Sequence, residues 1–151
     1  MKTKIHAAAG AVGLITVSAF WMSRATVELL GDAAAITTVK NCVLAGMVVL
    51  IPAMIIAGAS GFSLGKGWKS PVVARKKWRM RIIAANGLLV LVPSAFLLSS
   101  FATAGRFDKF FVVVQAIELV AGATNIALMS LNMRDGLSLR RKPLRLAARA
   151  R

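Results

Sequence analysis

A row of polar residues runs along the last apolar stretch of the chain. Its members are separated alternately by three and four residues, and they are Gln115, Glu118, Gly122, Asn125, Met129 and Asn132. In a helix this spacing places all six residues on one face. We call this face the polar seam. Because a bilayer offers polar groups no partners, we expect the seam to face protein or trapped water rather than lipid.

Glu118 is the one carboxylate of the polar seam, and it lies about 12 Å from Phe110 at ~1.5 Å per residue. An ionised carboxylate at that depth costs ~2.5 kcal/mol or more unless it is paired or protonated. Two roles are open for Glu118. In a functional role it would relay a proton or cation or contact a cofactor, and in a structural role it would form a buried ion pair that fixes helix register. The candidate partners are Lys40, which we expect to reach Glu118, and Arg24, which we expect to extend to the outer interface.

His6 precedes Gly10 and Gly13 at helical spacing near the start of the chain. A histidine beside glycines offers a haem both a ligand and room for its ring, so His6 is a candidate haem b ligand. The chain has a single histidine, and bis-histidine ligation would require a second subunit. The simpler interpretation, which we favour, is an interfacial histidine beside Lys4.

Catalytic and metal-binding motifs are absent from the sequence. It has no Gly-rich phosphate loop and no serine elbow, and its one histidine and one cysteine, Cys42, make a protein-only zinc site very unfavourable. General acid–base chemistry needs two groups of separated pKa near one substrate, and only Glu118 occupies a strongly perturbing position. We therefore expect no enzymatic activity and no metal site.

Four stretches of the chain are long enough to span a bilayer, and they would position these side chains. The first three lack charge and the fourth holds only Glu118; they are Ile5–Ser23, Asn41–Gly65, Ile82–Gly105 and Phe110–Met133. A spanning helix needs ~20 mostly apolar residues. The sequence thus predicts an all-α bundle of four transmembrane helices.

The predicted domain organisation is a four-helix membrane domain over 1–136, followed by a basic cytoplasmic tail over 137–151. The four helices are expected at about 5–30, 33–64, 80–105 and 109–134. Gly31 and Asp32 read as a turn in which Asp32 caps the second helix. Ser70 is expected to cap a short basic surface helix over 72–80.

The net charge of +15 is concentrated in three places: the N-terminus, the 66–81 connection and the tail. In a soluble protein such a charge would suggest nucleic acid, but in a membrane protein its distribution points elsewhere. Positive-inside bias places both termini and the 66–81 connection in the cytoplasm. There the basic connection and the basic tail are expected to bind anionic membrane lipid, and no nucleic acid.

A ladder of small residues follows the inner half of the second span, namely Ala53, Ala57, Gly61 and Gly65. Small residues every fourth position let another helix approach closely. That helix belongs either to the same chain or to a partner, so the ladder is compatible with a homo-oligomer or with a membrane-protein partner.

A resemblance covers most of the chain. The segments on which it rests are residues 79–89, 107–108, 115–125 and 131–136 (RMRIIAANGLL, FD, QAIELVAGATN and LNMRDG). They resemble small four-helix inner-membrane proteins of proteobacteria, a group known only as uncharacterised. The resemblance implies a multi-pass protein of the bacterial inner membrane and carries no activity across.

The sequence therefore favours a non-enzymatic accessory or assembly component of a membrane complex. Two alternatives remain open. One is a small proton- or cation-coupled transporter that works through Glu118, and the other is a haem b or quinone-associated redox subunit that uses His6.

Overall fold

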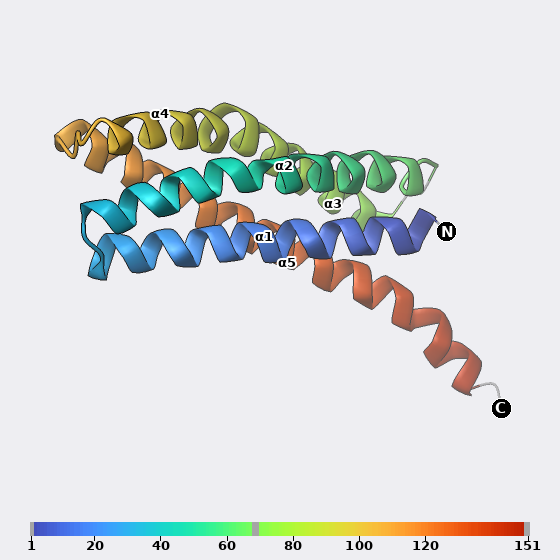
Figure 1. The fold of residues 1–151 in the computed structure, drawn as a ribbon. Helices are drawn as coiled ribbons and strands as arrows, with labels where there is room; N and C mark the ends of the chain where they lie inside the picture. The colour runs from blue at the N-terminus through green and yellow to red at the C-terminus, as the bar shows by residue number, and fades with distance from the viewer. Residues whose placement is uncertain (1, 68–69, 150–151) are drawn as a thin grey trace.

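The structure is a computed structural model that describes residues 2–67 and 70–149, with side chains between Thr3 and Ser138. Its elements are α1 (Lys2–Leu30), α2 (Ala33–Leu64), α3 (Pro71–Asn86), the π-helical turn η1 (Gly87–Leu91), α4 (Val92–Thr103) and α5 (Lys109–Arg149). Because α3, η1 and α4 follow one another without a break, they form a single rod, which we call the third rod (Figure 1). No strand occurs among the described residues.

Each of the four rods holds a segment long and apolar enough to cross a membrane, namely Thr3–Leu30, Ala33–Leu64, Pro71–Thr103 and Lys109–Ser138. Large apolar side chains are exposed on every rod. Examples are Ile15 at 68%, Val48 at 76%, Leu88 at 69% and Val120 at 69%. Such a surface suits hydrocarbon rather than water. The predicted all-α, four-helix transmembrane fold is confirmed, and the chain is a multi-pass membrane protein.

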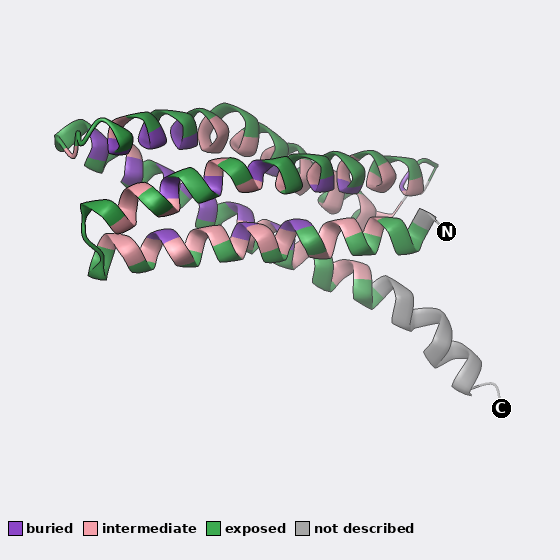
Figure 2. Cartoon of the chain, viewed as in Figure 1, coloured by how far each residue is buried: buried purple, intermediate pink, exposed green. Residues whose placement is uncertain are grey.

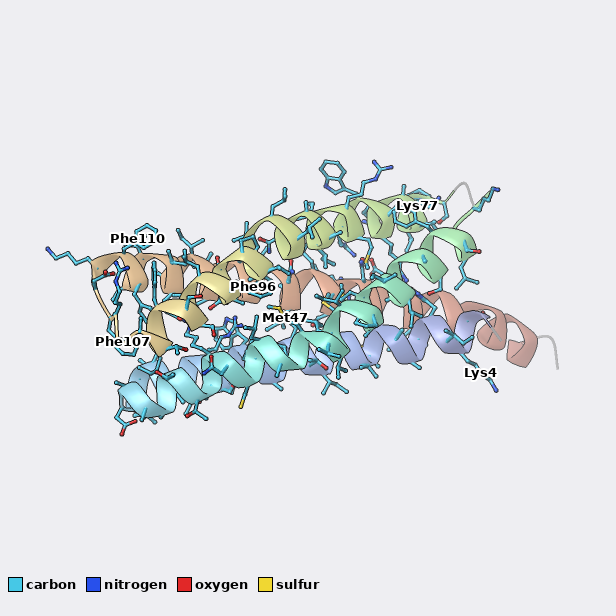
Figure 3. All side chains as sticks on the ribbon, turned by 45° about the horizontal axis from the view of Figure 1, so that its top comes forward. Lys4, Met47, Lys77, Phe96, Phe107 and Phe110 are labelled. Carbon is cyan, nitrogen blue, oxygen red and sulfur yellow. The ribbon has the colours of Figure 1, made fainter. Side chains whose placement is uncertain are left out.

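The rods close into a ring in which α1 contacts α2 and α5, while the third rod contacts α2 and α5 on the other side. Figure 2 shows the buried positions on the sides of the helices that face one another. A small apolar core of Leu98, Ala102 and Phe111 fills the ring beside the 104–108 connection. In Figure 3, Phe107 and Phe110 lie at one end of the bundle and Lys4 and Lys77 at the other. We call these the turn end and the basic end.

The α1–α2 turn is built as the sequence predicts. The Asp32 carboxylate accepts a hydrogen bond from the Ala35 N–H at 2.8 Å, which confirms Asp32 as the cap of α2. The Gly31 N–H donates to the Val27 carbonyl at 2.9 Å, and a Cβ at Gly31 would lie 2.7 Å from that oxygen. The turn therefore requires glycine.

The connection between α4 and α5 is closed by Asp108. Its carboxylate accepts a hydrogen bond from the Phe111 N–H at 3.0 Å and pairs with the Arg106 guanidinium at 3.1 Å. These two interactions hold the pKa of Asp108 below its usual value. Gly105 adopts φ of +67°, a left-handed conformation that glycine reaches without strain.

The third rod widens to a π-helical turn directly before Pro93. The Val92 N–H donates to the Gly87 carbonyl, five residues back. Pro93 has no N–H and its ring crowds the preceding turn, so the extra residue relieves the clash. Asn86, on the first side of this turn, and Ser94, on the other, both face into the bundle.

The boundary expected between a surface helix and the third span is wrong. The basic helix over 72–80 and the span expected from 80 to 105 form one rod, which begins at Pro71 and ends at Thr103, because α-helix and π-turn join without an interruption. Ser70 occupies the N-cap position, but its side chain makes no capping hydrogen bond.

The fourth helix also continues beyond its expected end near 134, since α5 runs to Arg149, while its apolar segment ends at Ser138. The side chains of the basic tail beyond Ser138, and Lys69 in the 66–81 connection, lie outside the described residues.

The small-residue ladder of α2 is occupied within the chain. Ala53 and Ala57 are buried. Gly61 faces the His6 ring of α1, whose Cε1 would lie 3.0 Å from a Cβ at that position. Gly65 faces Lys77 of α3, which donates to the Gly65 carbonyl at 2.8 Å. Of the two occupants that the sequence left open, the structure assigns the ladder to helices of the same chain.

Candidate functional site

Five polar side chains meet inside the bundle near the turn end. They come from three helices and are Arg24 and Glu28 of α1, Lys40 of α2, and Gln115 and Glu118 of α5, which we call the ionic cluster. Lys40 and Glu118 are each 1% exposed. Charged groups this deeply buried need partners of opposite charge within the bundle, because burial removes most of their solvation.

The two oxygens of Glu118 face different cations. Arg24 Nη1 lies 2.6 Å from Oε1, and Lys40 Nζ lies 3.6 Å from Oε2. Lys40 also pairs with Glu28 at 3.4 Å and donates to the Gln115 side-chain oxygen. The Phe111 ring lies beneath Lys40, with its centroid 5.6 Å from Nζ. Two carboxylates thus face two cations, and their charges balance within the chain.

The structure brings Glu118 together with both candidate partners. The expectation that Arg24 extends to the outer interface is wrong, because its side chain is 9% exposed and forms the shorter of the two contacts to Glu118. The physical reason is that the cost of burying Glu118 falls when two cations share the carboxylate.

Sequence reasoning missed two members of this region, Glu28 and Trp21. A signal was present, because Trp21, Arg24 and Glu28 are spaced three and four residues apart and so share one face of α1. Glu28 lies in the last turn of α1, so its position in the sequence indicated a helix end rather than a buried ion pair. Trp21 donates its indole N–H to the Leu119 carbonyl at 2.9 Å.

Trp21 also closes the polar seam. A Cβ at Gly122 would lie 2.9 Å from Trp21 Cδ1, so the indole rests directly on this glycine. Gly122 lies between Glu118 and Asn125 along α5. The indole therefore separates the ionic cluster from the polar groups nearer the basic end.

Beyond Trp21, the seam consists of amides that hold helices together. Asn86 of the third rod donates to the Asn125 side chain and to the Ala121 carbonyl, both at 2.9 Å. Asn132 contacts the Lys76 carbonyl at 3.5 Å. A pairing of Asn86 with Asn132 or His6, which their similar places near helix ends suggest, does not occur: Asn86 bonds to Asn125 and Ala121 instead.

Met129, the apolar member of the seam, is buried against α1, where its Cε would lie 3.4 Å from a Cβ at Gly13.

His6 faces α2 rather than the two glycines of its own helix. Its Nδ1 lies 3.0 Å from the Ala57 carbonyl and 3.1 Å from the Ser60 hydroxyl. The space at Gly13 is filled by Met54, whose sulfur would lie 3.0 Å from a Cβ there. The room that the haem hypothesis requires beside Gly13 is therefore taken by side chains of the same chain.

A metal centre has no set of ligands among the described residues, where no group of three or more His, Cys, Asp or Glu side chains comes together. Cys42 is exposed on α2.

A shallow groove opens where the third rod meets α5 beside the π-helical turn. It is mostly apolar and is lined by Asn86, Val90, Ala116, Ile117, Val120, Ala121 and Thr124. Its lining includes two small side chains, Ala116, which is exposed, and Ala121, which is buried within the chain.

The comparisons with known proteins found no match, either among family models, curated proteins or solved structures. The resemblance to small inner-membrane proteins of proteobacteria therefore stays a prediction.

Proposed function

We propose that this protein is a non-enzymatic accessory or assembly component of a larger complex in the bacterial inner membrane. The observation that carries the proposal is the internal neutralisation of the ionic cluster. Arg24 and Lys40 both lie within ion-pairing distance of Glu118, and Lys40 also reaches Glu28. A carboxylate held by two cations fixes the helices that carry them relative to one another, whereas a transported ion would have to displace these cations from Glu118.

The position of Trp21 supports the same role. Its indole rests on Gly122 and donates to Leu119, so it occupies the seam directly below Glu118. A relay across the membrane would need polar groups or water at this level. The arrangement instead favours a cluster that fixes the positions of α1, α2 and α5.

An accessory protein also needs a surface for its partner, and the groove between the third rod and α5 is the surface we assign to it. The occupant we expect is a transmembrane helix of another membrane protein, because Ala116 permits close approach and Asn86 and Thr124 offer polar groups.

Photo-crosslinking in cells tests this assignment. A crosslinker at Ala116 in the groove should give one discrete protein adduct, identified by mass spectrometry. The matched control is Val48, which is 76% exposed on α2 and faces away from the groove, and it should give none. Equal adducts at both positions would contradict the proposal, and an adduct of twice the protein's own mass would indicate a homo-oligomer instead.

We further propose that both termini and the 66–81 connection are cytoplasmic. The support is the excess of lysine and arginine at the basic end. In a chain that lacks Cys42, a cysteine at Ser70 should resist a membrane-impermeant thiol reagent in intact spheroplasts, whereas one at the exposed Thr103 should react. The reverse pattern would show the opposite orientation.

A proton- or cation-coupled transporter is the second candidate, and one observation favours it. The Glu28 side chain is 21% exposed and pairs with Lys40, which also pairs with Glu118. These three charged side chains therefore form a row from the surface of the turn end to the buried carboxylate. This candidate predicts an ion flux that depends on Glu118.

A further inference from the structure

A second charged cluster lies at the basic end, between α3 and α5. Arg79 Nη1 pairs with the Asp135 carboxylate at 2.7 Å and also lies 3.5 Å from the Asn132 side-chain oxygen. Arg134 Nε lies 3.9 Å from the same carboxylate. Lys76 Nζ would lie 3.0 Å from a Cβ at Gly136, so the absence of a side chain there makes room for the ammonium group.

The charges of this cluster do not balance. Asp135 is the only acidic residue of the basic end, because the other four acids of the chain, Glu28, Asp32, Asp108 and Glu118, lie toward the turn end. Its carboxylate is engaged by Arg79, whose side chain is 17% exposed. Among the described side chains, Lys76 has no ion-pair partner, and the Arg134 side chain is 74% exposed. Lys76 and Arg134 are therefore available to an external anion.

Apolar side chains at the same level indicate what carries that anion. Trp78 adjoins Arg79 in α3 and is 62% exposed, and Met133 and Leu137 flank Asp135 in α5 and are 46% and 48% exposed. A tryptophan beside basic residues is typical of the headgroup region of a bilayer. A soluble acidic ligand would leave these side chains uncovered, whereas the acyl chains of a lipid would cover them.

We propose that Lys76 and Arg134 form a binding site for the phosphate of an anionic phospholipid, beside the Arg79–Asp135 pair. The Asp135 carboxylate holds Arg79 in place, Gly136 makes room for Lys76, and the apolar neighbours contact the lipid chains. This inference goes beyond the proposed accessory role, because it assigns a ligand and a site that any role of the protein would share.

Electron paramagnetic resonance of spin-labelled lipids tests the site in the full-length protein reconstituted in phosphatidylcholine. The immobilised fraction of labelled phosphatidylglycerol, relative to labelled phosphatidylcholine, gives a relative association constant. We expect the wild-type protein to prefer phosphatidylglycerol. Each charge near a membrane surface is worth about a fivefold change in lipid affinity, so Arg134→Gln and Lys76→Gln should each lower the preference about fivefold.

The matched control is Arg106→Gln, which removes the same charge from an exposed side chain at the turn end. It should lower the preference clearly less than Arg134→Gln does, because Asp108 lies beside Arg106 and repels a lipid phosphate. Arg134→Gln alters a largely exposed side chain, so it remains a valid test if Lys76→Gln fails to fold. Equal affinity for the two lipids, or an equal loss in Arg106→Gln, would overturn the proposal.

Two further measurements distinguish a lipid phosphate from free phosphate and the α3–α5 site from the tail. Inorganic phosphate added as a competitor should not displace the labelled lipid, and displacement would assign the site to free phosphate instead. Removal of residues 139–151 takes away six basic residues, so it should lower, but not abolish, the preference for phosphatidylglycerol. Its complete loss in that variant would place lipid binding in the tail and refute the α3–α5 site.

Discussion

Removing one partner of the Arg24–Glu118 pair should destabilise the protein far more than removing both. Arg24→Met leaves two carboxylates, Glu118 and Glu28, to share the single ammonium of Lys40. Glu118→Met leaves the guanidinium of Arg24, 7% exposed as a residue, without its carboxylate. In the double variant, the Lys40–Glu28 pair remains and the cluster is again neutral.

The magnitude follows from the burial of both partners. Stranding one charge of a buried pair typically costs ~3–5 kcal/mol, so we expect a loss of about that size in the free energy of unfolding for each single variant. Replacing the whole pair by apolar side chains of similar size is often close to neutral. The double variant should therefore lose less than either single variant, and the two substitutions should be coupled by at least ~3 kcal/mol.

Reversible unfolding by sodium dodecyl sulfate in mixed micelles, followed by circular dichroism, measures all four proteins of this cycle. Lys109→Met, at an exposed position of the turn end, serves as the control and should change the unfolding midpoint little. If the double variant lost the sum of the two single losses, Arg24 and Glu118 would act independently. The two side chains would then not form the coupled pair on which the ionic cluster rests.

Three other substitutions test neighbouring parts of the structure. Gly122→Ala should lower stability by about 1–3 kcal/mol in the same assay, because its Cβ would lie 2.9 Å from the Trp21 ring; Trp21→Leu in the same chain should restore part of the loss, and no recovery would exclude this contact as the cause. Asn86→Leu should cost ~0.6–2 kcal/mol by leaving Asn125 without its donor, and a loss of similar size in the control Thr38→Leu, an exposed side chain that bonds only to its own helix, would show that the amide pair has no special weight. Because the pKa of Asp108 is lowered in the folded protein, its contribution to stability is present above the unfolded pKa and is lost as pH falls through the folded pKa. Asp108→Asn should therefore flatten the acid side of a plot of stability against pH, and an unchanged acid side would argue against the cap.

The fold and the orientation of the seam were predictable, because the fold depends on the length of the apolar stretches and the orientation depends on the spacing of polar residues along the helix. The 3–4 spacing from Gln115 to Asn132 places polar groups on one face of a helix whatever their partners are. In the structure Gln115, Glu118 and Asn125 are buried, with exposed fractions of 4%, 1% and 4%. Asp32 was equally predictable, since a cap depends on three neighbouring residues.

The pairing of side chains was less predictable, because it depends on how helices rotate against one another. Arg24 was expected at the interface, but the rotation of α1 turns the face of Trp21, Arg24 and Glu28 towards α5. The partner of Asn86 shows the same limit, because Asn86 bonds to Asn125 rather than to Asn132, and sequence periodicity does not show which residues of two helices lie at the same level.

Proton flux in proteoliposomes tests the central claim most directly, namely that Glu118 is a structural charge held within the chain. The purified protein is reconstituted with a pH-sensitive dye inside the vesicles, and a potassium diffusion potential supplies the driving force. Our account predicts a flux equal to that of protein-free vesicles for the wild-type protein and for Glu118→Gln alike. A wild-type flux that Glu118→Gln abolishes would contradict it and make the transporter the leading function.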